Sequence, residues 1–191
     1  QLLSDAAGRA EMQLGGAEMR MAGDSAFNFL MLDNQATQVE LSKGTLNLRV
    51  DGIDAGQSYE VDTPTVAFVV STPGEYRIDA TDDATHVSVY SGAGTVYGEN
   101  NASYALAANQ AYRFGNAQLT DIVGLPLRNP DDFDQWCFSL DSALDGAGNP
   151  VASNDVAPEM VGASDLDNYG TWQTDDDYGP VWYPDDMTVG W

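Results

Sequence analysis

Alternating polar and apolar positions dominate the first two thirds of the chain. "RAEMQL" (9–14) and "AEMRMA" (17–22) alternate around a Gly-Gly pair, which predicts a β-hairpin. The same period of two recurs in short segments separated by Gly, Pro, Asp and Asn. The predicted strands are 9–14, 17–22, 26–32, 37–41, 45–50, 58–62, 65–70, 75–79, 85–90, 94–97, 103–107, 111–114 and 117–122. Short strands at such regular spacing predict an all-β sandwich, roll or barrel.

The hydrophobic period changes at residue 129. Apolar residues then recur at the spacing i, i+3, i+4, i+7 of one helical face: Phe133, Trp136, Cys137, Leu140 and Leu144. We expect an amphipathic helix over 129–145, with Asn129 as its N-cap and Gly146 at its end. Cys137, the single cysteine, lies on the apolar stripe, so we expect a packed thiol rather than a reactive one.

Three parts follow from these patterns. Residues 1–128 form the predicted β-domain, and 129–145 form a helix packed on it. Residues 146–191 form an acidic extension rich in Tyr and Trp, with a linker composition over 146–157 and a predicted single helical turn over 164–170. Pro180 and Pro184 favour an extended course for this tail.

The net charge of −23 narrows the range of partners. The chain has 30 acidic residues against 7 Lys and Arg, and residues 129–191 contain 14 acids and no Lys or Arg. Nucleic acids and anionic membrane surfaces are bound through basic groups, so neither is expected as a partner. A protein partner, a further copy of the chain included, remains compatible with this charge.

No catalytic constellation emerges from the sequence. His86 is the only histidine, and no G-x-S-x-G nucleophile motif accompanies it. Carboxylates are so abundant that chance pairs are expected, which gives no evidence for a glycosidase. We therefore expect a protein that is not an enzyme and has no cofactor.

The segment "DLDNYGTWQTDD" (165–176) resembles a calcium loop. Asp165, Asp167 and Asp176 fall at positions 1, 3 and 12, but Tyr169 occupies position 5, where an oxygen ligand is needed. These three aspartates are calcium candidates, with caps and hydrated turns as the simpler interpretation. The aromatic residues of the tail are candidates for a protein interface, a sugar-binding platform, or a cover folded over the β-domain: Tyr169, Trp172, Tyr178, Trp182, Tyr183 and Trp191.

The segments "VELSKGTLNLRV", "YEVDTPTVAFVVSTPGEYRIDA" and "HVSVYSGAGTVYGENNASYALAANQAYRF" resemble the FecR-like domain family. Asn109 stands where that family usually has Gly. The tail is similar to a subgroup of secreted bacterial proteins that combine this domain with an acidic, Tyr/Trp-rich segment. The resemblance implies a jelly-roll-like β-sandwich and an extracytoplasmic location, periplasmic or at the cell surface.

Members of the family usually begin a strand or two before the position of Gln1, so we expect a sandwich that lacks its first strands. A missing strand exposes an edge that another chain can complete. The sequence thus favours a non-catalytic structural or interaction module, whose copies associate head to tail through the C-terminal segment into a polymer. The alternatives are a FecR-type sensor or regulatory domain of envelope signalling, and a carbohydrate-binding or hydrolytic protein. FecR signals through a membrane span, and the given sequence contains no such span. Envelope signalling is therefore the second interpretation.

Overall fold

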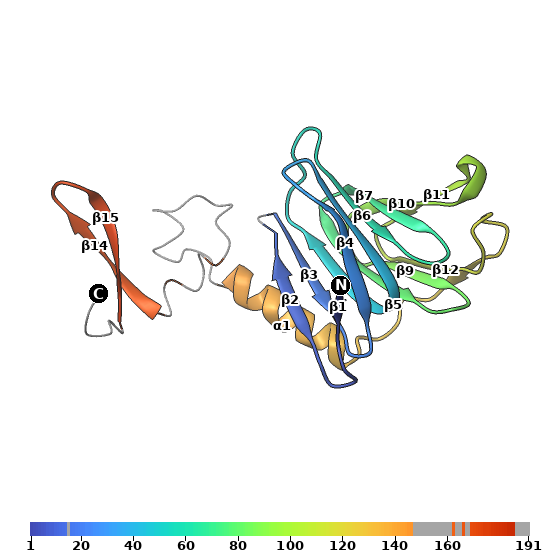
Figure 1. The fold of residues 1–191 in the computed structure, drawn as a ribbon, viewed down its shortest axis with the longest axis horizontal. Coiled ribbons are helices and arrows are strands. Elements are labelled where there is room, and N and C mark those ends of the chain that lie inside the picture. The colour runs from blue at the N-terminus through green and yellow to red at the C-terminus, as the bar shows by residue number, and fades with distance from the viewer. Residues whose placement is uncertain (15, 147–161, 163–165, 167–168, 186–191) are drawn as a thin grey trace. The chain divides into compact units, whose positions relative to one another are not determined.

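The computed structural model describes residues 1–14, 16–146, 162, 166 and 169–185. These residues fall into two units, Gln1–Asp134 and Gln135–Trp191, which are described separately. The first unit is built almost entirely of strands (Figure 1), as the alternating pattern predicts. The fold is therefore all-β with one helix, which confirms the predicted fold class.

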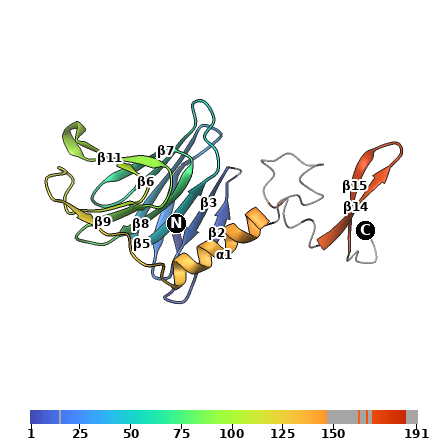
Figure 2. The same cartoon turned by 180° about the vertical axis from the view of Figure 1, so that it is seen from behind.

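Thirteen strands make one curled sheet whose two halves share β5 (Ala36–Val50). One half-sheet has the order β1-β4-β5-β6-β7-β10-β11, and its other strands are β1 (Leu2–Leu3), β4 (Ala26–Leu32), β6 (Ser58–Asp62), β7 (Ala67–Thr72), β10 (Ala93–Tyr97) and β11 (Ser103–Ala107). The second half-sheet has the order β2-β3-β5-β8-β9-β12-β13, with β2 (Ala10–Gln13), β3 (Ala17–Met21), β8 (Gly74–Ala80), β9 (Thr85–Val89), β12 (Gln110–Phe114) and β13 (Ile122–Leu125). Figure 2 shows the sheet from behind, with β5, β8 and β9 of the second half-sheet labelled. Among the strands that the structure describes, only β5 and β6 pair in parallel.

The long strand β5 corrects the sequence prediction of two strands with a turn at 43–44. Its first part pairs with β4 up to Lys43, and its pairing with β8 begins at Gly44. Gly44 has φ +95°, and a Cβ there would overlap Ser25. The glycine therefore marks a bend at which one strand passes between the half-sheets, rather than a turn between two strands.

The two half-sheets bury a common hydrophobic core. Phe68 of one half and Tyr76 of the other have ring centroids 5.4 Å apart. The fully buried side chains come from both halves and include Phe27, Leu41, Phe68, Met19, Leu48, Ile78 and Phe114. Truncating one of these phenylalanines to alanine costs about 3–5 kcal/mol in a packed core.

Two predicted elements begin three or more residues later in the structure. The strand expected over 117–122 is β13 at Ile122–Leu125, because residues 116–120 form a turn in which Asn116 accepts a hydrogen bond from the Thr120 amide. Helix α1 spans Asp132–Gly146 and is capped by Asp131, not by Asn129. Asp131 Oδ1 accepts from the amides of Phe133 and Asp134, while Asp134 Oδ2 accepts from the Asp131 amide. This reciprocal pattern is a capping box.

The second unit contains the rest of α1, where Cys137 is buried as expected, and a two-stranded hairpin of β14 (Gly170–Asp175) and β15 (Gly179–Pro184). The short η1 turn (Glu99–Asn101) belongs to the first unit. Most of the predicted linker (146–157) and most of the predicted helical turn (164–170) lie outside the described residues. No helix in the described part of the chain is long and apolar enough to cross a membrane.

Candidate interaction sites

The aromatic tail folds as a hairpin, whereas the sequence indicated a single extended segment. Trp172 and Trp182 lie directly opposite each other in the β14–β15 register. The Trp182 indole donates from Nε1 to the Leu166 carbonyl oxygen over 3.0 Å. Its ring covers Gly170, where a Cβ would overlap it. Glycine at this position is therefore what lets the Trp182 ring lie across the hairpin.

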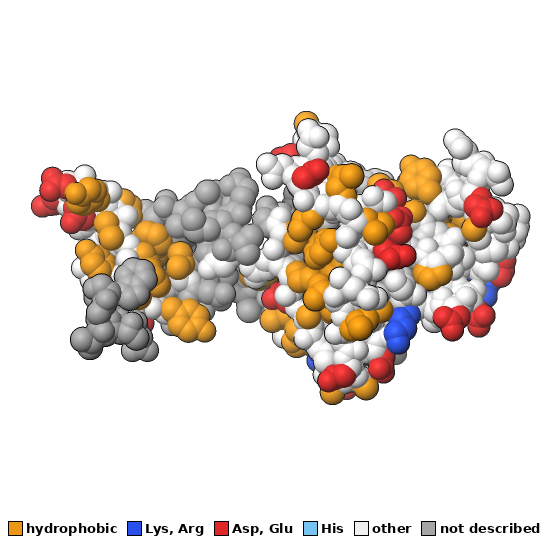
Figure 3. All heavy atoms as spheres, viewed as in Figure 1, with side chains coloured by type: hydrophobic (Ala, Val, Ile, Leu, Met, Phe, Trp, Pro, Cys, Tyr) orange, Lys and Arg blue, Asp and Glu red, His pale blue; other side chains and the backbone are white. Residues whose placement is uncertain are grey.

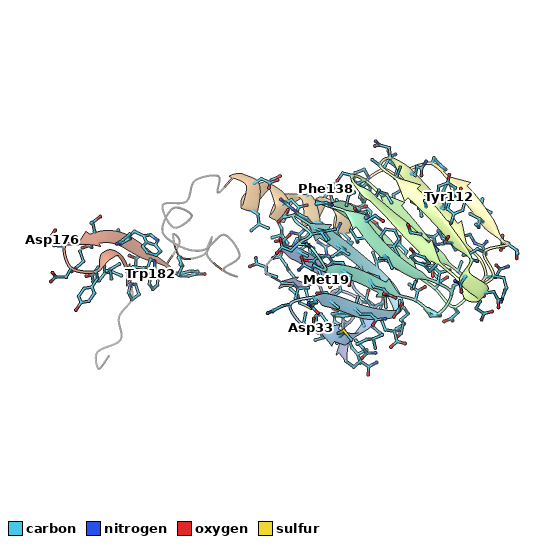
Figure 4. All side chains as sticks on the ribbon, turned by 90° about the horizontal axis from the view of Figure 1, so that it is seen from above. Met19, Asp33, Tyr112, Phe138, Asp176 and Trp182 are labelled. Atoms are coloured by element: carbon cyan, nitrogen blue, oxygen red, sulfur yellow. The ribbon has the colours of Figure 1, made fainter. Side chains whose placement is uncertain are left out.

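An aspartate closes the hairpin loop. Asp175 Oδ1 accepts from the amides of Asp177 and Tyr178 at 2.9 and 3.1 Å, and Gly179 takes the left-handed conformation with φ +76°. Asp176 is exposed at the end of the loop (Figure 4). The described residues contain no group of three side chains arranged to hold a metal. Asp165 and Asp167 lie outside those residues, so calcium binding through the predicted three stays a prediction.

The hairpin presents large aromatic side chains to solvent. Tyr169, Tyr178 and Tyr183 are 68%, 83% and 43% exposed. Trp172 and Trp182 are half-buried, and the Trp172 Nε1 is shielded from solvent without a hydrogen-bond partner among the described residues. Trp191 lies outside those residues. The structure thus brings five of the six predicted aromatic residues into one small element suited to burying in a partner.

A second exposed apolar surface lies at the edge of the β-domain. The two residues of β1 pair only with Ala26 and Phe27, so no other strand of the first unit lies beside the outer edge of β4 from Asn28 to Leu32. We call residues 28–32 the open β4 edge. Figure 3 shows hydrophobic side chains gathered over this region. The sequence predicts an edge without a strand but does not indicate which edge it is.

A buried charge cluster connects the β-domain to the start of α1. Arg77 of β8 is 4% exposed and donates to Asp79, Asp131 and the fully buried Asp134 over 2.9, 3.0 and 2.8 Å. Its guanidinium also lies 5.7 Å from the centre of the Phe133 ring. The Arg77 cluster therefore fixes the capped helix start on the sheet.

Electrostatics in the cluster favour the ionised forms. Burial opposes the charge of Arg77, but hydrogen bonds and attraction from Asp79 and Asp134 outweigh it and raise the Arg77 pKa. Burial also acts against the Asp131 carboxylate, yet the helix amide and Arg77 keep the Asp131 pKa below its ordinary value. Tyr90 donates its hydroxyl to Asp134 over 3.2 Å. This cluster was not predicted from the sequence, where its one local signal is the Asp-rich capping box after Pro130.

The single histidine has no catalytic neighbourhood in its own sheet. His86 of β9 lies opposite Asp79 on β8 and Arg113 on β12. Asp79 is already bound by Arg77. Neither neighbour is a Ser or Cys, so this register does not build a Ser-His-Asp arrangement around His86.

Comparisons with known proteins agree with the fold. Residues 1–93 match the family described as FecR protein. No curated protein sequence matches the chain. Two crystal structures of a "putative anti-sigma factor" from Parabacteroides distasonis ATCC 8503 share the fold with a TM-score of 0.56 each. The first, at 16% identity, aligns with 73% of this chain and with 63% of its own; the second, at 14% identity, aligns with 97% and 98%. The family match identifies residues 1–93 of this chain as a FecR family domain, and the fold agrees with it.

Proposed function

We propose that the chain is a non-catalytic regulatory module of FecR-type envelope signalling, which acts by binding another protein. The observation that carries this proposal is the match of residues 1–93 to the FecR family. The two structures with the same fold are described as putative anti-sigma factors, which supports a regulatory role. At 14–16% identity they support the fold directly and the role only as a proposal.

The chemistry of the described surface favours binding over catalysis. The carboxylates of the Arg77 cluster serve an ion pair and a helix cap. Large exposed apolar and aromatic side chains lie at the open β4 edge and on the hairpin. Residues of this kind contribute most of the binding energy at protein interfaces.

The net charge supports a proposal for the kind of partner, and the family supports a proposal for the location. A net charge of −23 favours a protein partner with a basic or neutral surface and disfavours nucleic acid and anionic membranes. FecR-type signalling takes place in the envelope, so we infer an extracytoplasmic location.

A transcript comparison tests the signalling role. The gene would be deleted in the source organism and restored with the wild-type chain or with Ile78→Asp, which places a carboxylate in the fully buried core. If the module regulates a sigma factor, deletion changes the transcripts of one coherent gene set, and only the wild-type chain reverses the change. An unchanged transcriptome under envelope stress would argue against signalling.

From the sequence alone, a self-associating structural module was the first interpretation and a FecR-type regulatory domain was an alternative. The comparisons favour the regulatory alternative. Self-association through the tail remains a prediction that is independent of the signalling role, and its structural basis is developed below.

A further inference from the structure

The open β4 edge lacks the charges and prolines that commonly protect an edge strand, although its pairing with β5 shifts register between Phe29 and Met31. Natural edges carry charges, prolines or covering segments that prevent pairing with another chain. β4 reads "AFNFLML" and has neither charge nor proline. At its far end Leu30, Met31 and Leu32 are 53%, 47% and 54% exposed. Such an edge is suited to accept a strand.

The β14–β15 hairpin, in contrast, is suited to donate a strand. Its two strands pair with each other and form a two-stranded sheet. A lone two-stranded hairpin is at best marginally stable in water, because it has too little apolar surface to bury. Addition to another sheet supplies the missing strands and covers the aromatic side chains.

The strand β14 is the better donor of the two. Its sequence "GTWQTD" contains no proline, so each N–H that faces its free edge is available to a new strand. β15 carries Pro180 and Pro184, which have no N–H. β14 has six residues and the open β4 edge has five, so their lengths match. The partnerless Trp172 Nε1 would also gain access to acceptors on a new neighbour.

Charge selects the direction of pairing. Lys43 lies opposite Ala26, at the start of β4, and is exposed without an ion pair among the described residues. The hairpin loop carries Asp175, Asp176 and Asp177. Figure 3 shows acidic side chains gathered at one end of the hairpin. An antiparallel arrangement of β14 on β4 places this acidic loop at the Lys43 end, and a parallel arrangement places it at the other end.

We propose that β14 of one copy pairs antiparallel with the open β4 edge of a second copy. The contact is heterologous, because each copy offers a hairpin and an edge that are different surfaces. Each added copy therefore leaves one hairpin and one edge unused, and growth continues into a ring or a filament.

Two blocking variants test this proposal in the full chain. Met31→Glu places a charge on the accepting edge, and Trp172→Ala removes the central side chain of the donor. The native mass of each would be measured by light scattering in about 0.15 M salt, which shortens the repulsion between two acidic chains to about 8 Å. We expect the parent to form oligomers and each variant to associate at least about ten-fold more weakly, as for loss of a central interface residue.

Mixing the two variants gives the sharpest result. Met31→Glu keeps its hairpin and Trp172→Ala keeps its edge, so the mixture forms one-to-one dimers and no longer oligomers. The matched control is Val123→Glu on β13, which has the same charge change at a side chain of similar exposure (45%) and should associate as the parent does. A second pair of variants keeps the hairpin intact. Lys43→Glu weakens association about two- to five-fold, as for a surface ion pair, and Asp176→Lys restores it.

Several outcomes would overturn the proposal. A parent chain that stays monomeric at high concentration has no such contact. If Met31→Glu blocks association but Trp172→Ala does not, the β4 edges pair symmetrically with each other and the hairpin is not the donor. If Val123→Glu is as damaging as Met31→Glu, charge alone prevents association. None of these results bears on the transcriptional test of the signalling role.

Discussion

Removing the cation of the Arg77 cluster should unfold the β-domain far more readily than its small change in volume suggests. Arg77→Met keeps a long apolar side chain but leaves Asp134 fully buried, with the Tyr90 hydroxyl and one helix amide as its remaining partners. Breaking a buried pair in this way costs about 3–5 kcal/mol, since a charge is left uncompensated. With a urea m-value of about 2 kcal/mol/M, the midpoint should fall by about 1.5–2.5 M.

A matched surface pair provides the control. Arg113 donates to Asp121 over 3.0 Å, and both side chains are substantially exposed. Arg113→Met should cost less than about 1 kcal/mol. In urea titrations followed by circular dichroism, equal losses for the two methionine variants would refute the reasoning about burial.

The double variant separates a lost contact from a stranded charge. Asp134→Asn removes the buried negative charge and keeps a side chain of similar shape. Arg77→Met with Asp134→Asn should therefore be more stable than Arg77→Met alone, by about 1 kcal/mol or more. A double variant that is less stable by the full sum of the single losses would show that the two charges do not compensate each other.

Three further predictions concern other parts of the chain. The Asp131 pKa is depressed in the folded state. The ionised Asp131 carboxylate therefore stabilises the fold above the ordinary pKa of 3.8, and this contribution is lost as pH falls through the lower folded value. In an acid titration, Asp131→Asn should lose stability less steeply than the parent. Burial and then the neighbouring Asp62 raise the Glu60 pKa, so Glu60→Gln should stabilise the fold at pH 7 by about 0.5 kcal/mol, and the gain should vanish in acid, where Glu60 is protonated in the parent. Gly170→Ala should displace the Trp182 ring, reducing the near-UV circular dichroism of the hairpin without moving the urea midpoint of the β-domain.

The strands of the β-domain were largely predictable because one face of each is buried. Alternation in "SYEVD" or "THVSV" puts every second residue into the core, and this signal survives in a single sequence. Gly44 was misread because a glycine after a lysine looks the same in a turn and in a strand bend. Only the pairing of β5 with both half-sheets distinguishes the two.

The Arg77 cluster was not predictable, because its members come from separate parts of the chain. Arg77 and Asp134 are distant in sequence and meet only after β8 and the helix start are in place. The cap residue Asp131 was not predictable for the same reason. Asn129 has an equal local preference for the N-cap position, and the reciprocal hydrogen bonds between Asp131 and Asp134 decide between the two. The hairpin was missed since its two prolines suggested an unpaired segment, whereas both fit on the strand opposite β14.

The proposal that the chain regulates transcription through a binding partner is tested most directly by measuring transcripts while the amount of the chain is varied. Stepwise expression in the deleted strain should change one sigma-factor gene set in proportion to the chain, and Ile78→Asp should have no effect at any level. A transcriptome that does not respond to the amount of folded chain would contradict the account.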